Sequence, residues 1–148
     1  MDFKQDTSNK TLGYTIFDHT ADLGLEIYGA DAAELFENAV WAVCDVMMDS
    51  TTVETSETRS FAVEGADWED LLVNFLREIL FMFNGTRFVP RECAVATIDE
   101  RHVTGQVGGE PFNPEKHLIN TEIKAVTYHR IAVRRTGDGW QGRVIFDV

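Results

Sequence analysis

The chain has 148 residues, of which 44% are hydrophobic and 26% charged, and its formal net charge is −12. This length suits one domain that buries a core without disulfides or structural zinc. A chain this acidic lacks the positive surface with which proteins bind nucleic-acid phosphates, so no strong direct nucleic-acid binding is expected. Hard cations and basic protein surfaces are the favoured partners instead.

Residues 1–12 are polar and are expected to form a disordered tail, with residues 13–148 forming a single domain. The tail has no apolar core of the kind that a signal peptide needs, and no apolar run approaches the ~20 residues that span a bilayer. The two cysteines, Cys44 and Cys93, are far apart and form no metal-binding pattern. These features predict a cytoplasmic protein with reduced thiols and no membrane partner.

After the tail, two strands are predicted at residues 14–17 and 25–28, on either side of a polar turn. A helix then follows the N-cap Asp31, with Glu34 three residues later in a capping-box-like arrangement. Apolar residues recur at helical spacing from there, and the helix is expected to end near Asp49 or Ser50.

The second helix is predicted to begin around Asp67 and to end at Asn84-Gly85, after a third strand at 58–63. Hairpins are predicted from strands 93–98 and 102–108, and from strands 123–135 and 140–148 around the turn at 136–139. The fold class is therefore α+β, with two helices packed on a curved, mostly antiparallel β-sheet in a single domain. No internal repeat is evident.

Three carboxylates are the candidate ligands for a metal. Phosphate-binding loops, nucleophile elbows and zinc-ligand spacings are all missing from the sequence. Asp22 lies in the first turn, Asp147 lies near the end of the last strand, and the α-carboxylate of Val148 lies beside it. Oxygen donors of this kind suit Ca²⁺, Mg²⁺ or Mn²⁺ rather than structural zinc. Spacing alone favours the plainer reading, in which these aspartates are solvated surface or turn residues.

The last hairpin supplies a register for this site. If Arg135 pairs with Trp140, then Tyr128 lies opposite Asp147 and His129 lies opposite Phe146. Tyr128 is then placed to orient the Asp147 carboxylate. The histidines His19, His117 and His129 are isolated in sequence, which favours hydrogen-bonded structural roles for them.

Three stretches of the sequence together resemble the archease family. The first is Asp18-His19-Thr20-Ala21-Asp22-Leu23-Gly24, followed by the first helix with its Leu-Phe-Glu-Asn-Ala core. The second is Asn113-Pro114-Glu115-Lys116-His117, and the third runs from Lys124-Ala125-Val126-Thr127-Tyr128-His129 to the final Val144-Ile145-Phe146-Asp147-Val148. The three occur in the family's order and spacing, and the resemblance extends from about Tyr14 to the last residue.

This resemblance implies an accessory protein of the GTP-dependent tRNA-splicing RNA ligase, which promotes guanylylation of the ligase and its multiple turnover. It also implies that the metal ligands are Asp22, Asp147 and the Val148 carboxylate. Relatives carry various residues at the position of Asp18, so no role is assigned to it. The expected function is therefore activation of the ligase through a carboxylate-bound divalent metal, without catalysis by the chain itself.

Two alternatives stay open. One is a metal-independent, chaperone-like partner of a tRNA-modifying enzyme such as a tRNA methyltransferase. The other is a metal-dependent hydrolase, which is disfavoured because no evident general base stands beside Asp22 and Asp147.

Overall fold

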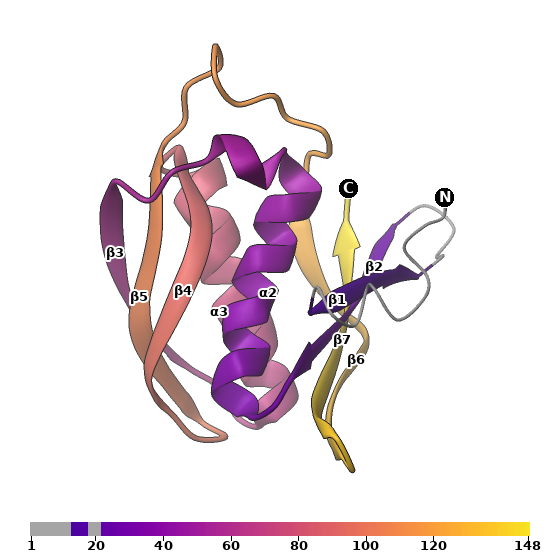
Figure 1. Ribbon diagram of the computed structural model, residues 1–148. Helices are drawn as coiled ribbons and strands as arrows, with labels where there is room; N and C mark the ends of the chain where they lie inside the picture. The colour runs from indigo at the N-terminus through magenta and orange to yellow at the C-terminus, as the bar shows by residue number, and fades with distance from the viewer. Residues whose placement is uncertain (1–12, 18–21) are drawn as a thin grey trace.

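The computed structural model describes residues 13–17 and 22–148 and places two helices between two β-sheets (Figure 1). The predicted tail and the turn residues Asp18 and His19 lie outside the described residues. No helix in the described ranges is long and apolar enough to cross a membrane. The elements, in chain order, are β1 (Tyr14–Phe17), β2 (Leu23–Gly29), α2 (Ala32–Met47), the 3₁₀ turn η1 (Ser50–Thr52), β3 (Glu57–Glu64), α3 (Trp68–Asn84), β4 (Phe88–Ile98), β5 (His102–Pro111), β6 (Ala125–Thr136) and β7 (Gly139–Asp147).

The predicted α+β class, with two helices and antiparallel strands, is confirmed. The strands form two sheets, in the orders β1-β2-β7-β6 and β3-β5-β4, and every pairing between them is antiparallel. The division into two sheets follows from the helices, because each buries nine residues spread over much of its circumference. A helix with so wide an apolar surface needs a covering layer on two sides. Figure 1 shows the three-stranded sheet on one side of α2 and α3 and the four-stranded sheet on the other.

A chain of aromatic rings crosses the core from one sheet to the other. Phe61 of β3 contacts Phe75 of α3 with ring centroids 5.2 Å apart, and Phe75 contacts Phe36 of α2 at 5.1 Å. Phe36 then meets Trp68 at 6.3 Å, and Trp68 meets Trp140 of β7 at 4.9 Å. Tilted and edge-on pairs of this kind add to the stability gained from burial alone. The rings therefore join both sheets and both helices into one core.

Both helices begin with the same local structure. The sequences Gly29-Ala30-Asp31 and Gly65-Ala66-Asp67 each precede a helix, and each aspartate caps it by accepting the N–H of the residue three positions later. The acidic residue at that position, Glu34 or Asp70, reaches back to the N–H before the cap. Each glycine lies against the backbone of a leucine in the first helical turn. The predicted capping arrangement at Asp31 and Glu34 is thus confirmed, and the same Gly-Ala-Asp junction occurs again 36 residues later.

Several element boundaries differ from the predicted ones, and two of the differences have an evident structural cause. Helix α2 ends at Met47, because Met48 takes an extended conformation and pairs with Ile119 in an isolated bridge. Strand β4 begins at Phe88, five residues before the predicted start, and includes Pro90. Proline is tolerated there because β4 is an edge strand whose register with β5 shifts just after Pro90.

Replacing Phe75 with alanine tests the aromatic core. Phe75 is fully buried and contacts rings on two different elements, so Phe75→Ala is expected to lower the free energy of unfolding by about 3–5 kcal/mol. Urea denaturation followed by circular dichroism measures this loss. Phe75→Leu, which keeps most of the volume, is expected to cost markedly less, and equal costs for the two variants would contradict the proposed packing.

Replacing Gly65 with alanine tests the repeated junction. A Cβ atom at Gly65 would lie 2.5 Å from the backbone nitrogen of Leu71, which cannot move without distorting the start of α3. Gly65→Ala is therefore expected to destabilise the protein by roughly 1–3 kcal/mol, measured as a lower urea midpoint. Gly137→Ala is the matched control, because a Cβ there meets nothing within 4 Å. A Gly65→Ala variant as stable as this control would refute the close approach.

Candidate metal centre

The candidate site lies where β2 and β7 end side by side. The last pair between them is Leu23 with Phe146, and this register, continued by one residue, sets Asp22 opposite Asp147. Side chains directly opposite each other on antiparallel strands have Cβ atoms about 4.5–5.5 Å apart. The strand register therefore brings together the two aspartates that the sequence singled out.

Both aspartates are placed on the face of the four-stranded sheet that is turned away from the helices, here called the outer face. Phe146 is fully buried against the helices, and successive residues of a strand point to opposite faces. Asp147 is accordingly exposed, and it shares the outer face with Arg143. Asp22 is half-buried. A cation can reach these carboxylates from solvent.

The backbone of Asp147 is anchored by pairing with the β6 side of the sheet. β7 is an inner strand, with β2 on one side and β6 on the other. On the β6 side, Asp147 pairs with Ala125, and its carbonyl accepts the N–H of Lys124 at 2.8 Å. The carboxylate thus projects from an anchored strand, which is the usual requirement for a well-positioned ligand.

The predicted register at this site is wrong beyond the hairpin turn. Arg135 does pair with Trp140, but Asp147 lies opposite Ala125 rather than Tyr128. Between the pairs Thr127–Ile145 and Ala132–Arg143, β6 advances five residues while β7 advances two, so β6 holds three extra residues.

A local backbone turn and one tertiary hydrogen bond account for this bulge. Arg130 adopts a positive φ of 56°, which turns the strand out of its regular path. The hydroxyl of Tyr128 donates to Asp70 at 2.6 Å, and this bond lowers the pKa of Asp70. Tyr128 therefore hydrogen-bonds to the first turn of α3 and does not orient Asp147. His129 is likewise displaced, since Val126 is the residue opposite Phe146.

The donor set determines which ions would fit. Among residues 13–17 and 22–148, no group of three or more His, Cys, Asp or Glu side chains is arranged to hold a metal. The expected set has two such side chains, Asp22 and Asp147, and takes its third donor from the carboxylate of Val148. All of these donors are hard oxygens on an acidic protein, which fits Ca²⁺, Mg²⁺ or Mn²⁺ with water completing the shell.

A second polar cluster fixes the loop that the sequence singled out at residues 113–117. His117 is fully buried; its Nδ1 accepts the N–H of Asn113 at 3.0 Å, so its Nε2 carries the proton and donates to Glu110 at 2.9 Å. Glu110 also accepts from the N–H of Glu54 and from the amino group of Lys116. His117 is thus a hydrogen-bonded structural histidine, as predicted. Glu110 was missed, and its one signal in the sequence is its place just before the proline-containing loop.

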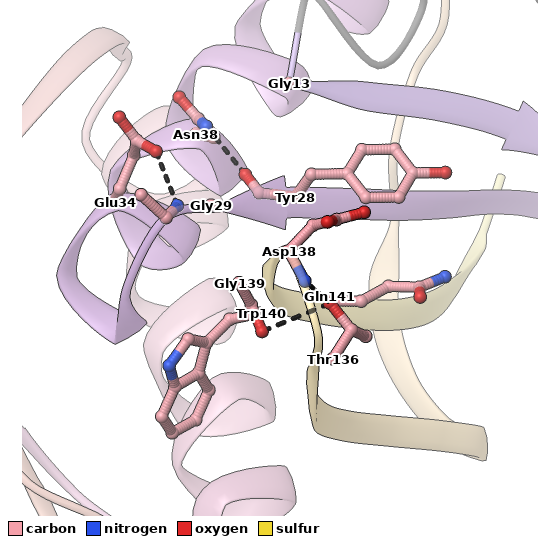
Figure 2. Close-up of a pocket in the computed structure, with 11 residues that line it drawn as sticks. Gly13, Tyr28, Gly29, Glu34, Asn38, Thr136, Asp138, Gly139, Trp140 and Gln141 are labelled. Atoms are coloured by element: carbon pink, nitrogen blue, oxygen red, sulfur yellow. Dashed lines mark hydrogen bonds between the residues drawn. The ribbon is translucent and has the colours of Figure 1, made fainter. Parts of the chain in front are cut away.

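A cavity of about 600 Å³ lies at the other end of β7, close to the β6–β7 turn (Figure 2). Several polar groups in its wall already bond within the protein. Glu34 accepts the N–H of Ala30, and Asn38 donates to the carbonyl of Tyr28. Seven residues of extended strand separate Trp140 from Asp147, roughly 23 Å. This cavity is therefore remote from the candidate metal centre.

The Glu110 cluster predicts a pH dependence of stability. Burial alone would raise the pKa of Glu110, but the bonds from Glu54, Lys116 and His117 outweigh it and hold the pKa at about 2. The pKa of Glu110 is lower in the folded protein than in the unfolded chain. The stability gained from the ionised Glu110 carboxylate is therefore present above about pH 4.5 and is lost as the pH falls toward 2. Glu110→Gln is expected to cost on the order of 2 kcal/mol at pH 7 and much less at pH 3, measured by urea denaturation. A cost independent of pH would contradict this assignment.

Comparison with known proteins identifies the family. The model of the Archease protein family matches residues 14–148. An archease of Methanosarcina barkeri is 36% identical over 139 residues, covering 91% of this chain and 95% of that relative. The solution structure of Methanobacterium thermoautotrophicum protein 1598 superposes with a TM-score of 0.78 at 35% identity, covering 93% of this chain and 99% of that one. A Thermotoga maritima structure described as an archease and possible chaperone shares the fold, with a TM-score of 0.64 at 22% identity. The chain therefore belongs to the archease family.

Proposed function

We propose that this protein activates a tRNA-splicing RNA ligase by means of a divalent cation held by Asp22, Asp147 and the Val148 carboxylate. The observation that carries the proposal is the pairing of Leu23 with Phe146, which brings both aspartates to one strand end and one face of the sheet. Family membership supports the ligase as the partner.

The charge of the protein supports a role as an accessory factor. At −12 the chain repels nucleic-acid phosphates at long range but attracts cations and basic surfaces. When bound, the cation would supply positive charge with which a nucleotide triphosphate in the ligase active site can be neutralised and oriented. The residues of this chain hold and present the ion: Asp147 from an inner strand, and Asp22 from the start of its neighbour.

Guanylylation of a ligase tests this proposal. The wild-type protein is expected to raise the rate of guanylylation at a fixed metal concentration, and Asp147→Asn or Asp22→Asn is expected to lower that activation by more than about tenfold, because either change removes a charged ligand. Asp138→Asn is the matched control, since Asp138 is an exposed aspartate at the opposite end of β7. Titration calorimetry with Mn²⁺ and Ca²⁺ measures cation binding by the same variants.

The outcomes separate the alternatives. No activation by the wild-type protein would refute the ligase role. Full activation by Asp147→Asn, despite lost cation binding, would refute the metal mechanism. That result would favour a metal-independent chaperone of a tRNA-modifying enzyme such as a methyltransferase, in line with the description of the Thermotoga maritima relative as a possible chaperone.

A further inference from the structure

A second polar cleft opens on the outer face of the four-stranded sheet, well separated from the aspartates. It has a volume of about 200 Å³ and is lined by Glu26, Ala132, Arg134, Gln141 and Arg143. Three neighbouring strands contribute, because β7 supplies Gln141 and Arg143 between β2 and β6. The pairs Ala132–Arg143 and Arg134–Gln141 are direct cross-strand neighbours, so the cleft is set by strand register.

Arg143 is held in one orientation. Its Nη2 and Nε both donate to Glu26 Oε2, at 2.7 and 3.3 Å, and its guanidinium lies 4.7 Å from the ring centroid of Phe17. Within the described residues, no hydrogen bond uses Nη1. An ion pair and an aromatic contact therefore fix the group while one of its nitrogens stays available to a ligand.

Arg134 supplies the second guanidinium. Its side chain is exposed, and no ion pair joins it to any residue in the ranges that the structure describes. Diagonal neighbours on antiparallel strands lie about 7–8 Å apart, within reach of two arginine side chains, so Arg134 and Arg143 can approach the same ligand. Ala132, directly opposite Arg143, leaves the space between them unfilled. The amide of Gln141 adds a neutral donor.

The charge of the cleft and its surroundings favours an anion. Glu26 is neutralised by Arg143, so the lining keeps the single positive charge of Arg134. Residues 125–147 contain four arginines and two aspartates, whereas the rest of the chain has nine basic and 23 acidic residues. An anion is therefore repelled by most of the molecule and attracted to this hairpin.

We propose that this cleft binds one phosphate group through Arg134, Arg143 and Gln141. A phosphate offers more acceptor oxygens than a carboxylate, so it can occupy two guanidinium groups and an amide at once. The site is distinct from the aspartate pair, because four residues of β7, roughly 13 Å, separate Arg143 from Asp147. The inference does not depend on the proposed function.

Titration of the full chain with inorganic phosphate at constant ionic strength tests the site. The Nε–H signals of Arg134 and Arg143 in NMR spectra are expected to shift and saturate, with a dissociation constant on the order of 1 mM. Arg134→Gln is expected to weaken binding at least tenfold. The phosphate affinity of Arg134→Lys is expected to lie between those of Arg134→Gln and the wild type, because lysine keeps the charge but cannot form a bidentate hydrogen bond.

Arg101→Gln is the matched control, since it removes the same charge from an exposed residue in the turn between β4 and β5, and it is expected to leave binding unchanged. Linear shifts without saturation, or equal binding by Arg134→Gln and wild type, would overturn the site and leave only nonspecific ion binding. The affinities for GMP and for a short 5′-phosphorylated RNA distinguish the two possible sources of the phosphate. Equal affinities support a small phosphate ligand, whereas RNA binding more than tenfold tighter than GMP supports a nucleic-acid phosphate.

Discussion

The aromatic chain from Phe61 to Trp140 is the interaction on which the rest of the structure depends, because it crosses all the layers of the fold. No strand pairing joins the two sheets in the described part of the chain, and each sheet packs on the pair of helices between them. The rings of Phe75 and Phe36 join the helices at the centre. Trp68 contacts both Phe36 and Trp140, and so connects the helices to β7. Packing of this kind tolerates little displacement of either sheet, since protein interiors are close to crystalline density.

Burial of the inward-facing residues of β7 determines which of its side chains lie on the outer face. Val144 and Phe146 are fully buried against the helices, so alternation along β7 turns Arg143 and Asp147 outward. The same strand therefore carries the proposed cation ligand Asp147 and the proposed phosphate-binding Arg143 on one face. A slip of one residue in the strand pairing would turn both charged side chains toward the helices.

Local signals in the sequence predicted the elements well, while contacts between distant segments decided the rest. The caps at Asp31 and Asp67 and the turn before Trp140 act over a few residues, so their patterns are readable. The bulge in β6 was not readable, because it depends on a hydrogen bond from Tyr128 to a helix 58 residues away. The partition of strands into two sheets likewise depends on how both helices are covered, which no single segment encodes.

The candidate metal ligands were proposed from residue type, position and family resemblance, and the strand register explains why Asp22 and Asp147 lie side by side. Glu110 and Arg134 escaped notice because a carboxylate or guanidinium in a strand looks like any solvated charge. Their significance comes from neighbours brought in by the fold, namely His117 in one case and Arg143 in the other.

The two helix junctions share their backbone plan but not their connections. Glu34 in the first bonds only the N–H of Ala30 among the described residues, whereas Asp70 in the second also accepts the hydroxyl of Tyr128. The first turn of α3 is therefore hydrogen-bonded to the bulge of β6, whereas no such bond joins the first turn of α2 to β6 among the described residues. A displacement of the β6 bulge would therefore strain the start of α3 directly, and the duplicated junction is asymmetric in this respect.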